Sequence, residues 1–314
     1  MTDQIILVVG HGSRLPEAVA QFLEFSEALS THLGRAVRHC FLELADPDLA
    51  AGLTGAAQSA GPGGQVIVLP LFLGPGGHQK NDVASAIQWA RQQFPGIDFR
   101  YGAPLGSHAH LVELLDLRVQ QCLQAATEPL PLSETIVLVL GRGSSDPDSN
   151  GDVAKMARLL FENRPYRAVE YAYQAAARPT VEESLRRCRM LGARQVVLAP
   201  FILFTGRVDN FMRAASQRAA DELGLRILHA DYLGLHPLLL AVVQQRLQEA
   251  LAGTAAMTCD LCKYRFPLAG YEQQVGRPQT SHHLHGGSAH SHDHHHQDHH
   301  DHDHDHDHEP DHHH

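Results

Sequence analysis

Three side chains in the first half of the sequence are of the types that hold a divalent metal ion. His11 lies between two glycines directly after an apolar run, Glu43 follows a second run, and His78 follows a third through a glycine-rich loop. Two neutral imidazoles and one carboxylate suit a borderline ion such as cobalt, nickel, zinc or ferrous iron, and three protein ligands leave positions open for exchange. Loop histidines that cap helices or bind an anion are the alternative interpretation.

The stretches that connect these residues alternate between short apolar runs and longer segments of helical period. The predicted strands lie near residues 4–10, 36–43, 65–71 and 98–101. The predicted helices cover residues 16–33, 79–93 and 108–125. This alternation is typical of a parallel sheet covered by helices, in which ligands bind beyond the carboxyl ends of the strands. We therefore expect the three candidate ligands to converge.

The same pattern occurs a second time at an offset of roughly 130 residues. "IILVVGHGSR" near the N-terminus matches "TIVLVLGRGSS" at residues 135–145, and later strands and loops match in the same order. The strands of the second copy are predicted near residues 135–140, 168–174, 195–201 and 226–230. The sequence thus predicts two duplicated α/β domains, over residues 1–127 and 133–253, joined by a linker.

The candidate ligands are confined to the first copy. The second copy has Arg142, Ala175 and Arg207 at the positions of His11, Glu43 and His78, the last pair after a one-residue gap. Because guanidinium groups bind carboxylates in a bidentate way, the two arginines are candidates to bind an acidic ligand if the domains face one another. Arginines that cap helices or lie on the surface are the alternative. His108 and His236, by contrast, occupy equivalent positions in both copies, which favours a helix-start or packing role.

The composition excludes several classes of protein. The formal charge is −10, but 27 acidic and 25 basic residues precede residue 281, so the body is nearly neutral. A nucleic-acid surface needs clustered positive charge, so we expect no such partner. The first ten residues have no basic lead, and no apolar run reaches about 18 residues. We expect a cytoplasmic monomer or homodimer without a membrane interaction.

The C-terminal region differs from both copies. Cys259 and Cys262 form a C-x-x-C pair, whose thiolates can hold one ion or join a cluster, or can be an idle, reducible pair. Residues 281–314 hold 17 of the 25 histidines, interleaved with acidic residues, a composition that cannot bury a core. We expect residues 254–280 to form a separate segment, and residues 281–314 to be a disordered tail that binds divalent ions at modest affinity.

Several stretches resemble the sirohydrochlorin chelatase family, in particular its long cobaltochelatase form. They include "VGHGSR" at residues 9–14, "FLELADPDL" at 41–49 and "LPLFLGPGGHQKND" at 69–82. The resemblance implies flavodoxin-like α/β domains and one active site per chain. It further implies that His11 and His78 are the metal-binding and catalytic histidines, with Glu43 as a third ligand.

The resemblance also implies the substrates. These are sirohydrochlorin, a reduced tetrapyrrole with many carboxylates for which Arg142 and Arg207 are candidate partners, and Co²⁺, with Fe²⁺ or Ni²⁺ as other ions. Inserting a divalent ion displaces two pyrrole N–H protons, so a histidine is expected to accept a proton as the ion transfers. No G-x-x-x-x-G-K-[ST] loop occurs, which predicts an ATP-independent lyase.

Three points stay open in the sequence. Iron insertion to give sirohaem uses the same scaffold, and first-row metal selectivity depends on geometry and supply more than on ligand identity. A metal-storage protein or metallochaperone, whose globular body only docks a partner, is the alternative from another class. Long cobaltochelatases can carry an M-x-C-x-x-C motif with an iron–sulfur cluster, and Met257, Cys259 and Cys262 fit it. Only two cysteines are local, so a four-iron cluster would need further ligands from elsewhere.

Overall fold

The computed structural model describes residues 4–205, 216–218, 221–256 and 273. The strands of the first half are β1 (Gln4–Gly10), β2 (Val37–Phe41), β3 (Gln65–Pro70) and β4 (Asp98–Tyr101). Its helices are α1 (Pro16–Leu33), α2 (Leu49–Ala60), α3 (Val83–Gln93) and α4 (Ala109–Ala125), and a π-helical turn, η1 (His78–Asp82), precedes α3. The predicted strands are confirmed, and the helix predicted from residue 79 divides into η1 and α3.

The second half repeats this order. Its strands are β5 (Thr135–Gly141), β6 (Ala168–Tyr173), β7 (Gln195–Pro200) and β8 (Arg226–His229). Its described helices include α5 (Pro147–Phe161), α6 (Val181–Met190) and α8 (Pro237–Ala252). Each half forms a parallel four-stranded sheet, in the orders β2-β1-β3-β4 and β6-β5-β7-β8. The predicted fold class, two duplicated α/β units with helix-covered parallel sheets, is confirmed.

The strands are buried on both faces, as their continuous apolar runs require. In β1, Leu7 and Val9 pack with α2 and α3, whereas Ile6 and Val8 face the opposite side of the sheet. All four side chains are fully buried. Successive side chains of a strand point to opposite faces, so one apolar run supplies both layers of the core.

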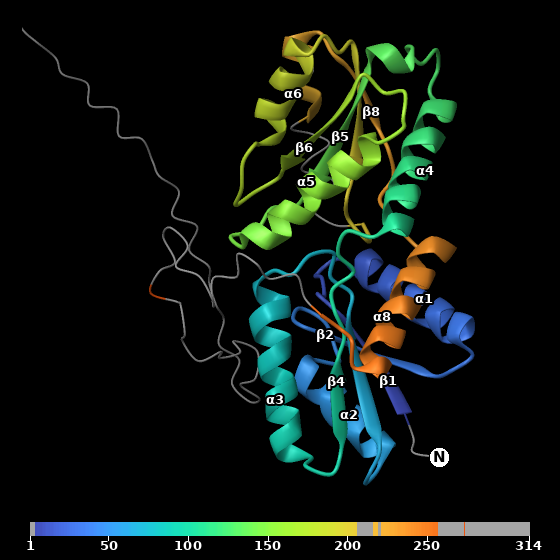
Figure 1. Cartoon of the computed structure of the whole chain (residues 1–314), viewed down its shortest axis with the longest axis vertical. Helices are drawn as coiled ribbons and strands as arrows, with labels where there is room; N and C mark the ends of the chain where they lie inside the picture. Colours follow the sequence, from blue (N-terminus) through green and yellow to red (C-terminus); the bar gives the residue numbers. More distant parts are fainter. Residues whose placement is uncertain (1–3, 206–215, 219–220, 257–272, 274–314) are drawn as a thin grey trace, which may run out of the picture. The chain divides into compact units, whose positions relative to one another are not determined.

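The last helix of each half packs on the sheet of the other half. Helix α4 contacts β7, β8 and α5, and α8 contacts β3, β4 and α1, as Figure 1 shows. The two exchanged helices also contact each other. One hydrophobic core accordingly runs through both halves, and it includes Leu114 and Leu115 of α4 and Val242 and Val243 of α8, all fully buried.

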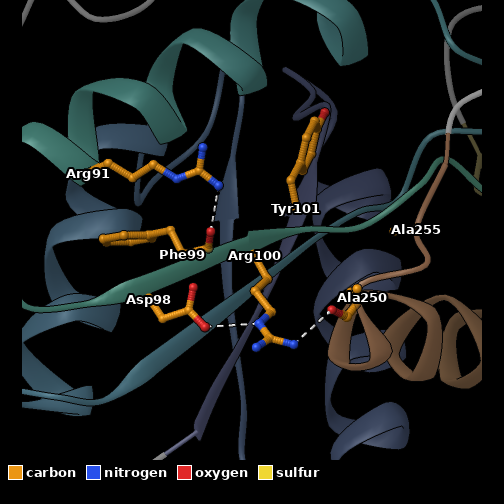
Figure 2. Close-up of a pocket in the computed structure, with 8 residues that line it drawn as sticks. Arg91, Asp98, Phe99, Arg100, Tyr101, Ala250 and Ala255 are labelled. Carbon is orange, nitrogen blue, oxygen red and sulfur yellow. Dashed lines mark hydrogen bonds and ion pairs between the residues drawn. The ribbon is translucent and has the colours of Figure 1, made fainter.

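Arg100 of β4 ties the C-terminal end of α8 to the first half (Figure 2). Its Nε donates to Asp98 Oδ2 over 2.9 Å, and its Nη1 donates to the carbonyls of Leu251 and Ala250. A cation is favourable at this end of a helix, where carbonyl groups lack partners within the helix. Asp98, Arg100 and Ala250 line a pocket of about 270 Å³ beside β4, which none of the candidate ligands lines.

The domain boundaries predicted at residues 127 and 133 stay a prediction, and both repeats lie within one compact unit. None of the helices in the described ranges has the length and apolar character needed to cross a membrane.

Candidate active site

The structure gathers the three candidate ligands at the carboxyl end of the first sheet. His11 follows β1, Glu43 follows β2 and His78 opens η1 after the loop that leaves β3. The rings of His11 and His78 are perpendicular, with centroids 4.9 Å apart. His11 Nδ1 lies 3.6 Å from Glu43 Oε1, and both side chains are about one-third exposed. The predicted convergence of these side chains is thus observed.

A glycine determines how closely His11 and Glu43 approach. Gly12 has φ +88°, and a Cβ atom at this position would lie 1.7 Å from the carbonyl oxygen of Glu43. The backbone of Glu43 donates from its N–H to the carbonyl of His11 over 3.1 Å. Glycine adopts this conformation without strain, and its lack of a Cβ leaves room for the carbonyl of Glu43. The backbone therefore holds the imidazole beside the carboxylate.

The ring of His78 is oriented by an aspartate one helical turn further on. His78 Nδ1 lies 2.8 Å from Asp82 Oδ2, and the Asp82 side chain is 6% exposed. A carboxylate accepts this hydrogen bond, so Nδ1 carries a proton, and in the neutral form of the ring the lone pair is on Nε2. Metal-binding histidines in proteins are commonly oriented in this way.

His11 has the same tautomer for a different reason. Its Nδ1 donates to the carbonyl oxygen of Gly12 over 3.3 Å, which leaves the lone pair on Nε2. Burial lowers the pKa of His11, and the neighbouring His78 and Arg142 lower it further. Glu43 and the Gly12 carbonyl oppose these effects without reversing them. His11 is therefore neutral at pH 7, as a metal ligand or a proton acceptor must be.

The second half presents a different side chain from the same type of turn. Gly143 has φ +85°, and Ala175 N–H donates to the carbonyl of Arg142 just as Glu43 does to His11. The predicted pairing of these positions is confirmed. Arg142 is exposed, and its Nη1 lies 3.4 Å from His11 Nε2. Arg142 thus faces the first copy, which is the condition on which its predicted role depends.

The candidate ligands are close together but do not form a complete ligand set in this conformation. Within the described ranges, no three His, Cys, Asp or Glu side chains are grouped so that they could hold one metal ion. Glu43 lies on the protonated Nδ1 side of His11, away from the Nε2 lone pair. Binding of one ion by both imidazoles and the carboxylate needs a rotation of the Glu43 or His11 side chain.

Other predicted residues lie outside the part of the chain that the structure describes. These are Arg207, Met257, Cys259, Cys262 and the histidine-rich residues 281–314. Their predicted roles stay predictions.

The expectation for His108 and His236 is confirmed. His108 Nδ1 accepts from His110 N–H over 3.1 Å at the start of α4, and His236 Nδ1 accepts from Leu238 N–H over 3.2 Å at the start of α8. Both histidines therefore cap the exchanged helices.

Asp82 and Lys80, which lie in η1 with His78, were not predicted as functional residues. The i, i+4 spacing of His78 and Asp82 in "HQKND" indicates a side-chain pair on one helix face. No local signal identifies the partners of Lys80, which are Asp146 and Asp148 in the second half.

Comparison with known proteins agrees with this architecture. The family model CbiX matches residues 5–122 and again residues 136–250, so the two halves match separately. The chain is 36% identical over 267 residues to a sirohydrochlorin cobaltochelatase of Priestia megaterium, covering 84% of this chain and 85% of the relative. A sirohydrochlorin ferrochelatase of the same organism is 30% identical, covering 79% of this chain and 90% of the relative.

Solved structures show the same fold. SirB from Bacillus subtilis with Fe³⁺ is similar with a TM-score of 0.68 and 28% identity, covering 81% of this chain and 96% of that structure. The sirohydrochlorin chelatase SirB in complex with cobalt, from Bacillus subtilis subspecies spizizenii, has a TM-score of 0.65 and 27% identity, covering 80% and 96%. By its sequence, its duplicated fold and these relatives, the chain belongs to the CbiX family.

Proposed function

We propose that this protein is a chelatase that inserts Co²⁺ into sirohydrochlorin without ATP. The observation that carries the proposal is the pair of perpendicular imidazoles, both with the lone pair on Nε2, beside a carboxylate and opposite Arg142. Membership of the CbiX family and the relatives that are sirohydrochlorin chelatases support it.

In this proposal, His11 and His78 bind the ion through Nε2, and Glu43 is the third ligand. Three ligands leave positions open for the pyrrole nitrogens of the macrocycle. The carboxylate of Asp82 keeps the proton of His78 on Nδ1, so the ring presents Nε2 to the ion. Since Co²⁺ is a substrate here, the ligands must release it as well as bind it.

The reaction exchanges one divalent ion for two protons. As the ion moves to the four ring nitrogens, the two pyrrole N–H protons must leave the macrocycle. One of them passes to water, and the Nε2 lone pair that releases the ion becomes free to accept the other. The lowered pKa of His11 then favours transfer of that proton onward to water. The same nitrogen thus serves first as a ligand and then as a base.

Arg142 is proposed to bind a carboxylate of the tetrapyrrole. Its guanidinium is exposed and lies next to His11 Nε2, the proposed metal ligand. A carboxylate that binds the guanidinium in a bidentate way would draw it from this nitrogen. Arg207 is proposed for the same role on the basis of its place in the repeat.

Iron insertion is the second candidate activity. One relative that matches most of the chain is a sirohydrochlorin ferrochelatase, and one similar structure is of SirB with Fe³⁺. Cobalt is favoured because the cobaltochelatase relative has the higher identity over a similar length.

The test is direct. Purified protein is incubated anaerobically with sirohydrochlorin and either Co²⁺ or Fe²⁺, and the absorption spectrum is followed. Faster insertion than the uncatalysed reaction, with cobalt preferred, is the expected result. Metal uptake without faster insertion would indicate a metal carrier and reject the enzymatic proposal.

For the C-terminal region, we propose that residues 281–314 collect divalent ions and that Cys259 and Cys262 bind a metal ion or an iron–sulfur cluster. The proposal rests on composition and spacing alone. Truncation after residue 280 is expected to lower the Co²⁺ bound per chain more than it lowers kcat, measured by equilibrium dialysis and the insertion assay. Protein purified anaerobically without iron would argue against the cluster.

A further inference from the structure

A buried cluster of three charged side chains connects η1 to the second half. Lys80 Nζ lies 2.9 and 2.8 Å from the two carboxylate oxygens of Asp146 and 2.7 Å from Asp148 Oδ2. The side chains of Lys80, Asp146 and Asp148 are 2%, 1% and 10% exposed. The cluster is therefore inside the protein, although its members are far apart in the sequence.

The three contacts match the donor capacity of lysine, because an ammonium group has three N–H donors. All three donors are taken up by carboxylate oxygens of Asp146 and Asp148, so Lys80 is present as the charged ammonium group. Buried ion pairs contribute little net stability compared with apolar packing. Their presence is better explained when they select one arrangement of the segments that they join.

The arrangement that this cluster specifies concerns His78. Lys80 is two residues further along η1, and its backbone N–H donates to the carbonyl of Gly76 over 3.0 Å. Gln79, between them, is tied to the first half, because Tyr101 Oη donates to its carbonyl over 2.7 Å. The turn is thus attached to its own sheet through Gln79 and to the second half through Lys80.

The loop that leads into η1 also lies close to the second half. A Cβ atom on Gly74 would be 2.7 Å from Ser149 Oγ, and one on Gly76 would be 3.6 Å from Ser144 Oγ. Ser144 and Ser149 flank Asp146 and Asp148. Lys80 is accordingly the charged contact in a closely packed junction.

The fold of the repeat does not require an aspartate at position 146. Asp146 is the N-cap of α5, where it also accepts from Asp148 N–H over 3.1 Å. The equivalent position before α1 is Leu15, which makes no side-chain capping bond. The first copy forms the same helix without this acid, so capping alone does not account for the cluster.

We propose that Lys80 is a positioning residue for metal transfer, which fixes the turn of His78 against the start of α5. This inference rests on the proposed function of His78. With the turn held on both sides, the His78 ring stays beside His11. Without Lys80, His11 and Arg142 keep their places, but the ring of His78 loses its fixed position.

The test compares K80M with K80M/D146N/D148N. K80M leaves two buried carboxylates without their cation and is expected to lower Tm. The triple variant removes all three charges, and asparagine is as good an N-cap as aspartate, so it is expected to regain most of the Tm. Its kcat for cobalt insertion is expected to stay about 10- to 100-fold below wild type, because displacements of about 1 Å have effects of that size. Its KM for sirohydrochlorin is expected to stay within about threefold of wild type.

R164M is the matched control. Arg164 Nε lies 2.9 Å from Asp116 Oδ2 in a partly buried ion pair that does not involve η1. R164M is expected to lower Tm without lowering kcat. If the triple variant has the same kcat as the wild-type protein, the positioning role of Lys80 is overturned. Insertion of cobalt by the wild-type protein would still support the proposed function in that case. A triple variant in which KM rises as kcat stays constant would equally overturn the positioning role. No insertion by the wild-type protein would instead reject the proposed function.

Discussion

The turns that follow β1 and β5 have the same backbone and different chemistry. Gly12 and Gly143 have φ values of +88° and +85°, and each closely approaches the carbonyl of the loop after the neighbouring strand. Between the flanking glycines, one turn presents His11 and the other Arg142. Glycine sterics therefore fix the geometry in both halves, and the side chain in between is free to diverge. The first half has become the proposed metal site and the second its cationic counterpart.

The largest expected effect comes from removing the imidazoles from the first turn and from η1. H11A/H78A removes both proposed Nε2 ligands, so insertion should fall by at least about 10²- to 10⁴-fold, as loss of acid–base groups commonly does. The absorption assay with sirohydrochlorin and Co²⁺ measures the rate, and circular dichroism verifies the fold. A folded double variant that still inserts cobalt would refute the assignment.

Alanine at the two equivalent glycines separates backbone geometry from chemistry. G12A and G143A both force a Cβ into a neighbouring carbonyl at positive φ, so each should lower the free energy of unfolding by about 1–3 kcal/mol or more. Only G12A displaces Glu43 from His11, so it should also lose more activity. Urea unfolding and the insertion assay measure the two effects. Equal activity losses in the two variants would contradict the division of roles.

The carboxylate can be exchanged between the halves as well. E43Q should weaken Co²⁺ binding by about 10- to 100-fold, whether Glu43 binds the ion or orients His11. A175E places a carboxylate at the equivalent position, beside an arginine instead of an imidazole, and should leave Co²⁺ stoichiometry unchanged. Isothermal titration calorimetry measures both. A new tight site in A175E would mean that the carboxylate, and not the histidine, determines where the ion binds.

The smallest expected effect concerns the cationic turn. R142A removes one proposed carboxylate contact, so KM for sirohydrochlorin should rise about tenfold, while kcat changes less. R186A is the control, because Arg186 is an exposed arginine of α6 that pairs with Glu182. Steady-state kinetics with varied tetrapyrrole measures both variants. A KM in R142A equal to that in R186A would exclude Arg142 from substrate binding.

Much of this architecture could be predicted from the sequence because its signals are local or repeated. The apolar runs predicted each strand within the described ranges, and the repeat correctly paired Arg142 with His11 and Ala175 with Glu43. In open α/β sheets, ligands bind beyond the carboxyl ends of the strands, and this rule predicted that His11 and His78 would lie close together.

Other features could not be predicted because they depend on contacts between distant segments. The apolar face of α4 indicates that it is buried, but not that it packs on the second sheet. The contact of Lys80 with Asp146 likewise joins residues whose sequence contexts carry no common signal. Asp82 could have been found, since its spacing from His78 is that of one helical turn.

The exchange of α4 and α8 also bears on how the duplicated gene arose. In a free-standing repeat with the same helix placement, the apolar side of the last helix and one face of the sheet would be exposed to water, and exchange of that helix with a second identical chain would bury both. Fusion would then have turned a symmetric pair into one polypeptide. After fusion, a mutation could alter one repeat without altering the other. This independence is the condition for one repeat to have an imidazole where the other has a guanidinium.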